Sequence, residues 1–360
     1  MVTVLGTSRF GSRVSRHLRL GLVGLLALAL AGCAPRNVAQ RAAPSPDASI
    51  ERVFVATQRD LSDLGQVFGQ QRSGGLRFLR VDVSVPPTHQ AGNIEWPEGT
   101  PDAATDFVVT GTKVYPGPRD MIDAMQAQSP GNETLVFVHG YNNTFSDAVY
   151  RFAQIRADFG LTGPGVAYSW NSAGDPRGYA YDRDSVLYSR DDFERLLGHL
   201  TARPGQRVVL LAHSMGAQLV METLRQAALR GDRRLLERIG AVVLMSPDID
   251  PDVFRRQAEA IGKLPQPFLI FVSQADRVLS LAGFLTGRKP RLGVIAGPEQ
   301  LEGIKGVQVI DFTRLADGKG LNHAVPVTSP AAISVLSGLV DQARDDTRAF
   351  EGYMMLGLKK

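Results

Sequence analysis

The chain has 360 residues, a formal net charge of +4 and a single cysteine. Residues 1–32 contain four arginines and no acidic residue, so the rest of the chain has a formal charge of 4 − 4 = 0. This balance excludes the basic footprint of a nucleic-acid-binding protein, and one cysteine excludes internal disulfides and cysteine-rich metal clusters. The length that remains suits one large domain with a substantial core.

The N-terminal segment has the features of a secretory signal peptide. Its arginines precede an apolar run that is too short to span a membrane. The run ends in Leu30-Ala31-Gly32-Cys33, which resembles the lipobox of bacterial lipoproteins, where the cysteine is lipidated and becomes the mature N-terminus. We therefore expect residues 1–32 to be a signal peptide, Cys33 to carry the lipid, and residues 33–49, with several prolines and alanines, to form a flexible tether.

These features predict a lipoprotein of the bacterial cell envelope that is anchored to a membrane through Cys33 and faces the periplasm. Ala34, rather than an aspartate, follows the cysteine, which by analogy with enteric sorting rules favours the outer membrane.

Residues 50–130 predict strands at one edge of a sheet. Apolar alternation or short apolar runs predict strands at 50–56, 76–85 and 107–113. The stretch 86–106 is rich in Pro, Gly, Thr and Asp and predicts an irregular loop. We expect these strands to form the antiparallel edge of a larger sheet.

From residue 131 to 350, predicted strands alternate with predicted helices. The strands are expected at 134–138, 166–168, 207–212, 241–245, 268–272 and 307–312. The helices are expected at 145–158, 184–200, 215–230, 251–261 and 330–350. This alternation predicts a mostly parallel sheet covered by helices on both faces, with the ligand site beyond the carboxyl ends of the strands. Residues 50–350 would then form a single domain, followed by a tail at 351–360.

One strand-to-helix junction carries a candidate nucleophile. An apolar run ends in Ala212-His213-Ser214-Met215-Gly216, and a helix-compatible segment follows at once. This is the layout of the nucleophile elbow of α/β-hydrolases, G-x-S-x-G, with Ala212 at the first glycine position. Small residues on either side let strand and helix approach each other around a strained serine. Serine is also a common helix N-cap, so the other parts of a catalytic site must be present as well.

A serine nucleophile needs a base and an acid, which follow it in this fold in the order Ser, acid, His. His323 is the only one of six histidines that comes after Ser214, and it lies in a loop after the last predicted strand. Asp276, in the loop after the penultimate strand, is the predicted acid. Asp248, at the end of the preceding strand, is the alternative, although helix N-capping also explains its acidic cluster.

The backbone N–H groups of Met215 and Tyr141 are the predicted oxyanion hole. The residues expected to support the site or line its pocket are His139, Gly140, Asn142, Trp170, His213 and Gly216. Trp170 fits a pocket wall and the core equally well. His213 is expected to point away from the nucleophile. The interval 245–265 leaves no room for a large lid domain, which predicts an exposed cleft.

The chain resembles a bacterial family of uncharacterised esterase/lipase-like α/β-hydrolases, many of them lipoproteins. The resemblance spans residues 50–345 and rests on Val53–Arg59, Val83–His89, Val138–Asn142, Tyr168–Trp170, His213–Gly216, Ser246–Asp250 and Asn322-His323. It implies hydrolase activity with Ser214, Asp276 and His323 as the triad, and it names no substrate.

Together these residues predict a membrane-tethered serine hydrolase of the carboxylesterase or lipase type that works through an acyl-enzyme. The expected substrate is a small ester or an ester-bearing component of the envelope. An acyltransferase or an amidase would use the same residues, and a non-catalytic envelope lipoprotein would use the fold as a binding scaffold. No cluster of metal ligands is present in the sequence, so no metal or cofactor is expected.

Overall fold

The computed structural model describes residues 37–61, 68–287, 289–316, 321–345 and 353–355, and residues from 38 onward form one compact unit. The predicted signal peptide and Cys33 lie outside the described residues. None of the described helices is both long enough and apolar enough to cross a membrane.

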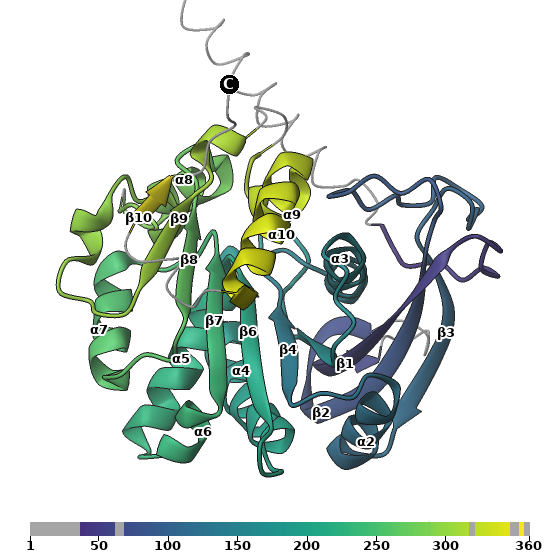
Figure 1. Ribbon diagram of the computed structural model, residues 1–360, viewed down its shortest axis with the longest axis horizontal. Coiled ribbons are helices and arrows are strands. Elements are labelled where there is room, and N and C mark those ends of the chain that lie inside the picture. The colour runs from purple at the N-terminus through teal and green to yellow at the C-terminus, as the bar shows by residue number, and fades with distance from the viewer. Residues whose placement is uncertain (1–36, 62–67, 288, 317–320, 346–352, 356–360) are drawn as a thin grey trace, which may run out of the picture. The chain divides into compact units, whose positions relative to one another are not determined.

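A ten-stranded sheet runs through this unit (Figure 1). The strand order is β10-β9-β8-β7-β6-β4-β5-β1-β2-β3. The strands are β1 (Ser49–Leu61), β2 (Phe68–Val85), β3 (Val108–Tyr115), β4 (Glu133–Val138), β5 (Gly165–Ser169), β6 (Arg207–His213), β7 (Ile239–Met245), β8 (Phe268–Val272), β9 (Gln308–Asp311) and β10 (Tyr353–Met355). The strands from β10 to β1 run parallel, and β2 and β3 extend the sheet antiparallel.

The mostly parallel sheet with antiparallel N-terminal edge strands is therefore confirmed, with one refinement. β1 is parallel to β5 and antiparallel to β2, so only β2 and β3 form the antiparallel edge. Residues 353–355, in the stretch expected to be a tail, pair with β9 as the strand at the other edge.

Helices cover both faces of the sheet (Figure 1). They are α2 (Pro118–Gln128), α3 (Phe145–Asp158), α4 (Tyr179–Leu200), α5 (Met215–Leu229), α6 (Arg233–Glu237), α7 (Pro251–Ile261), α8 (Arg277–Leu285), α9 (Val325–Thr328) and α10 (Pro330–Asp345). One apolar cluster packs α2, α4, α5, α6 and α7 on one face, and a second packs α3, α9 and α10 on the other. Side chains of one strand alternate between them: Val136 and Val138 of β4 join the first cluster, and Phe137 joins the second.

Four helices were missed by the sequence analysis. α6 and α9 are too short to show a helical period. α2 has a signal that was overlooked, because Pro118 opens it and Met121 and Met125 are buried one turn apart. α8 begins at the predicted acid, and Asp276 is its N-cap.

Part of the expected tether packs against the domain. Val109 of β3 donates its N–H to the carbonyl of Gln40 at 2.8 Å, and the N–H of Ala39 donates to the Ser146 hydroxyl at 3.1 Å. β3 is an edge strand whose backbone groups are available for pairing, which explains why an extended chain associates with it. The N-terminal segment is thus held against the domain by residue 39.

Candidate active site

Ser214 sits at a tight turn between β6 and α5. Its backbone has φ 53° and ψ −122°, a region that costs a residue with a side chain about 1–3 kcal/mol. A Cβ on Gly216 would lie 2.3 Å from the carbonyl oxygen of His139, and a Cβ on Gly140 would lie 2.7 Å from the Cβ of Ser214. Both positions therefore require glycine, since the elbow and the end of β4 touch through their backbones. Ala212 is fully buried, so its methyl group is accommodated.

The Ser214 side chain does not cap α5, which removes the N-cap explanation for a serine at this position. Within the part of the chain that the structure describes, its hydroxyl makes no hydrogen bond. Catalytic hydrogen bonds are often long in a free enzyme and form only when the substrate is bound.

His323 and Asp276 form the hydrogen-bonded pair that the chain order predicted. Nδ1 of His323 lies 2.7 Å from Oδ2 of Asp276, and the Asp276 side chain is fully buried. The other carboxylate oxygen accepts the N–H of Leu279 at 2.9 Å, which fixes the carboxylate in place. With Nδ1–H donated to Asp276, Nε2 is the nitrogen that can accept a proton.

His213 joins the elbow to the loop that carries His323. The two imidazole rings lie 4.7 Å apart, and Nε2 of His213 lies 3.2 Å from the carbonyl oxygen of His323. Burial, and then the neighbouring His323, lower the pKa of His213 well below its ordinary value, so the ring is neutral and its Nε2–H donates to that carbonyl. His213 therefore faces His323 and connects its loop to the residue next to the nucleophile.

Asp248, the alternative acid, has other partners. Its Oδ1 accepts from Nε of Arg291 at 2.6 Å, and both side chains are 3% exposed. Its Oδ2 accepts from the hydroxyl of Tyr179 at 2.9 Å. The structure therefore brings Asp276, and not Asp248, to His323.

The candidate oxyanion hole lies between the start of α5 and the loop after β4. Met215 is the first residue of α5, where backbone N–H groups have no partner within the helix. In the loop, Asn142 adopts φ 59° and donates its N–H to Oδ2 of Asp182 at 3.0 Å. The loop that contains Tyr141 is thus held in position by a carboxylate on α4.

Two buried charges that the sequence analysis missed organise this loop. Arg59 donates to the carbonyls of Asn143 at 2.7 Å and Ser172 at 3.0 Å. Burial lowers the pKa of Arg59 to about 10, against the opposing attraction of Asp182, so it is a cation at neutral pH. Asp182 accepts from the Ser172 hydroxyl at 2.6 Å. The available signal was an arginine three residues after the apolar run Val53–Ala56 of β1.

His139, at the end of β4, packs against Trp170, at the end of β5. Their rings stack at 5.1 Å with an interplanar angle of 7°, and Nε1 of Trp170 donates to the carbonyl of His139 at 2.7 Å. Burial, and then Arg59, lower the pKa of His139 to about 3, so it is neutral and unsuited to be the base. Trp170 is fully buried and belongs to the core. At the rim, the ring of Tyr141 packs edge-on against Tyr179 at 5.3 Å.

The nucleophile is less accessible than the expected exposed cleft. Ser214 is 2% exposed, and the His323 side chain is 17% exposed. The expected cleft was inferred from the short interval after β7. The longer connection between β8 and β9 also packs against the carboxyl end of β7. Within that connection, Gly293 donates its N–H to the carbonyl of Pro247 at 3.0 Å, which brings the connection over the end of β7.

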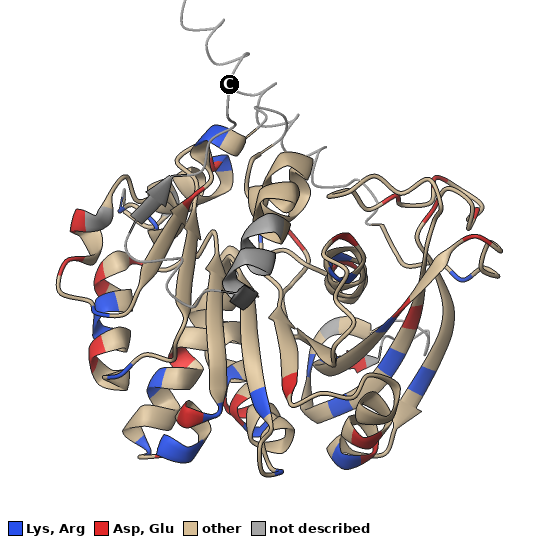
Figure 2. Cartoon of the chain, in the orientation of Figure 1, with Lys and Arg blue, Asp and Glu red and all other residues tan. Residues whose placement is uncertain are grey.

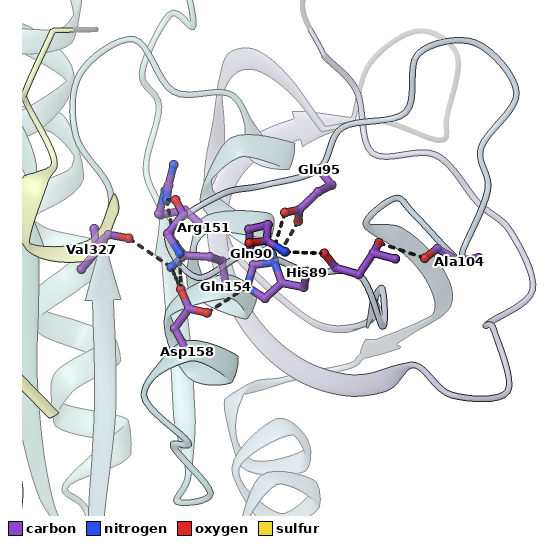
Figure 3. A network of polar contacts seen from close by, with 10 residues as sticks. His89, Gln90, Glu95, Ala104, Arg151, Gln154, Asp158 and Val327 are labelled. Carbon is purple, nitrogen blue, oxygen red and sulfur yellow. Dashed lines mark hydrogen bonds and ion pairs between the residues drawn. The ribbon is translucent and has the colours of Figure 1, made fainter. Parts of the chain in front are cut away.

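A second histidine network, around His89, contacts Val327 in α9 (Figure 3). Nδ1 of His89 lies 2.8 Å from Glu95, and Nε2 lies 2.8 Å from Asp158 at the end of α3. Gln154, which also donates to Asp158, donates to the carbonyl of Val327 in α9 at 3.1 Å. The network thus joins the long loop 86–106 to α3 and to the helix that directly follows His323.

Burial alone lowers the pKa of His89, but hydrogen bonds to Asp158 and Glu95 outweigh it and raise the pKa above its ordinary 6.5. The opposite holds for Asp158, whose pKa burial raises but whose bonds to His89 and Gln154 bring it below its ordinary 3.8. Both pKa shifts therefore favour the ion pair between protonated His89 and ionised Asp158.

Residues 119–339 match the model of the family described as "Alpha/beta hydrolase of unknown function (DUF900)". The chain belongs to this family. The match begins in α2 and ends within α10, so it includes the elbow, Asp276 and His323. Membership of this hydrolase family confirms the predicted α/β-hydrolase fold. No curated protein matches the chain in sequence.

Several solved structures are similar to this α/β hydrolase. A dienelactone hydrolase from Anabaena variabilis is 12% identical, with 82% of this chain and 96% of that chain covered and a TM-score of 0.36. Esterase B from Lactobacillus rhamnosis is 13% identical, with coverages of 93% and 99% and a TM-score of 0.33. Carboxyl esterase 2 from Tuber melanosporum is 11% identical, with coverages of 86% and 91% and a TM-score of 0.39.

Among the described residues, no group of three or more His, Cys, Asp or Glu side chains is arranged to hold a metal ion.

Proposed function

We propose that this α/β hydrolase cleaves carboxylic esters by the serine acyl-enzyme route. The observation that carries the proposal is the 2.7 Å pairing of His323 with the buried Asp276, on a loop that contacts the residue next to the strained Ser214. A histidine with one nitrogen bonded to a buried carboxylate and the other available is the arrangement that activates a serine hydroxyl.

In the proposed reaction, Oγ of Ser214 attacks the ester carbonyl carbon while its proton passes to Nε2 of His323. The N–H groups of Met215 and Tyr141 donate to the oxyanion that forms. The bond to the alcohol oxygen then breaks, and His323 returns the proton to that oxygen. A water molecule next loses a proton to His323 and attacks the acyl-enzyme, which releases the carboxylic acid and restores Ser214.

We further propose that the enzyme is a lipoprotein anchored through Cys33 to a membrane of the bacterial envelope, the outer membrane being favoured, and that it faces the periplasm. The lipobox-like Leu30–Cys33 sequence supports this assignment. Cys33→Ser should release the protein from the membrane fraction. Continued tight association would contradict the anchor.

The test of ester cleavage is turnover of p-nitrophenyl butyrate by the purified protein and by Ser214→Ala. We expect turnover by the parent chain and loss of at least about 10⁴-fold in the variant. Ser273→Ala is a matched control, because Ser273 is a buried serine at the end of β8 whose hydroxyl has no hydrogen-bond partner among the described residues. Equal turnover by the parent chain and Ser214→Ala would contradict the proposal. Adding an alcohol acceptor would reveal acyl transfer by the same residues.

A further inference from the structure

An exposed apolar surface lies beside the candidate active site. Leu281 and Phe284 of α8 and Leu321 are each 59% exposed, and we refer to these three residues as the α8 apolar surface. The N–H of Arg277, one turn before Leu281, donates to the carbonyl of Leu321 at 3.0 Å, which joins α8 to the loop of His323. Both segments continue directly from Asp276 and into His323, so the surface borders the pair that would perform the chemistry.

The segment that contains α8 is basic. Residues 277–298 contain Arg277, Arg288, Lys289 and Arg291 and no acidic residue. Arg291 is paired with Asp248, and Arg277 and Lys289 are exposed. Figure 2 shows acidic residues instead in the long loop 86–106 between β2 and β3. Exposed apolar side chains flanked by basic residues are typical of a segment that lies on an anionic lipid surface.

The N-terminal segment contacts the domain at the first turn of α3 and at the start of β3. The N–H of Ala39 donates to the hydroxyl of Ser146 in α3, which follows the carboxyl end of β4, and the carbonyl of Gln40 accepts from Val109 of β3. Ser214 and Asp276 follow the carboxyl ends of β6 and β8 in the same sheet. Cys33 precedes Ala39 by 39 − 33 = 6 residues, which span at most about 20 Å. A lipid on Cys33 would therefore hold the start of α3 close to the bilayer.

We propose that the α8 apolar surface rests on the bilayer that holds the lipid of Cys33, so that the site receives esters dissolved in the membrane. The substrate class is thus an acyl ester carried by a membrane lipid. This inference rests on the proposed function and on the proposed anchor.

The first test measures contact with lipid and needs no catalysis. The lipidated Phe284→Cys chain is placed in vesicles of equal parts phosphatidylcholine and phosphatidylglycerol, and the new thiol is labelled with an environment-sensitive fluorophore. We expect spin-labelled lipid to quench this fluorophore. The matched control is Leu229→Cys. Leu229 is an exposed leucine (63%) at the last residue of α5, the helix that begins next to Ser214 and runs away from the candidate site, and we expect no quenching there. Equal quenching at both positions, or none at Phe284→Cys, would overturn the inference.

The second test measures the consequence for the substrate. In Leu281→Gln/Phe284→Gln, the ratio of turnover of a vesicle-embedded fluorogenic triacylglycerol to turnover of soluble p-nitrophenyl butyrate should fall about tenfold, because two apolar contacts with lipid are lost. Leu229→Gln should keep the parent ratio. An unchanged ratio in the double variant would count against the inference. Turnover of neither ester by the parent chain would contradict the proposed function, while the quenching result would still decide the surface. If the fluorophore also labelled the thiol of Cys33, this residue would carry no lipid, which would contradict the proposed anchor.

Discussion

Two histidines of this α/β hydrolase are held by carboxylates at almost equal distances, and their surroundings give them different roles. Nδ1 of His323 is 2.7 Å from Asp276, and Nε2 of His89 is 2.8 Å from Asp158. His89 has a second carboxylate, Glu95, on its other nitrogen, so both nitrogens are occupied. Among the residues that the structure describes, His323 has a carboxylate on one nitrogen only, and it lies beside the elbow.

A histidine–carboxylate pair is therefore not by itself a catalytic feature. A general base needs one nitrogen free for the proton it accepts, whereas a structural histidine gains most from a partner on each nitrogen. Both histidine–carboxylate pairs also help to hold the loop of His323 in place. Asp276 fixes His323 directly, and the His89 network reaches α9, two residues beyond it, through Gln154 and Val327.

The largest expected effect separates the two histidines directly. His323→Ala should lower kcat for p-nitrophenyl butyrate by at least about 10⁴-fold, because the serine loses its base. His89→Ala should retain most of the activity at a temperature where it is folded. Comparable losses in both variants would show that the comparison is wrong.

Changing the carboxylates should separate Asp276 from Asp248. Asp276→Asn should lower kcat about 10⁴-fold, because the amide no longer holds His323 in the productive tautomer. Asp248→Asn leaves Arg291 buried without its charge partner and should act mainly on the free energy of unfolding. A larger kcat loss in Asp248→Asn than in Asp276→Asn would return Asp248 to the role of acid.

A smaller effect should follow from displacing the nucleophile without touching either histidine pair. The new methyl group of Gly140→Ala would approach Cβ of Ser214 to 2.7 Å, and the shift needed to relieve this contact should lower kcat about 10²-fold. Gly198→Ala on the exposed side of α4 meets nothing within 4 Å and should keep the parent kcat. Equal rates in the two variants would mean that the elbow tolerates displacement.

The smallest effect concerns stability and its dependence on pH. His89→Gln should lower the free energy of unfolding by about 2 kcal/mol near pH 6, since hydrogen bonds to two carboxylates are lost. A histidine whose pKa is raised on folding stabilises fully below its ordinary 6.5 and loses that contribution as the pH rises through the raised value. On the acid side, the contribution ends as Asp158 is protonated below its ordinary 3.8. Urea unfolding across pH should therefore show the parent chain and His89→Gln converging in alkali. A difference that persists there would contradict the charged state assigned to His89.

Much of this architecture could be predicted from the sequence because periodic patterns report on burial. The buried strands β4, β6 and β8 are continuous apolar runs, and α3 and α7 were predicted with the bounds that the structure shows. The candidate triad could be predicted because chain order excludes every histidine but one.

The rest depends on contacts between residues far apart in the chain. Arg59 reaches Asn143, 84 residues away, and His89 reaches Asp158 across 69 residues, so no local pattern announces either pair. The packing of the connection after β8 over the end of β7 was missed because it joins residues far apart in the chain, such as Gly293 and Pro247. The contact between His213 and His323 could not be predicted because the sequence does not show where the loop of His323 returns.

The most direct test of the central claim is to map the site of fluorophosphonate labelling by mass spectrometry. We expect a covalent adduct on Ser214 in the parent chain and in His89→Gln, a much slower adduct in His323→Ala, and none in Ser214→Ala. An unlabelled parent chain, or an adduct on another residue, would contradict the claim that His323 and Asp276 activate Ser214.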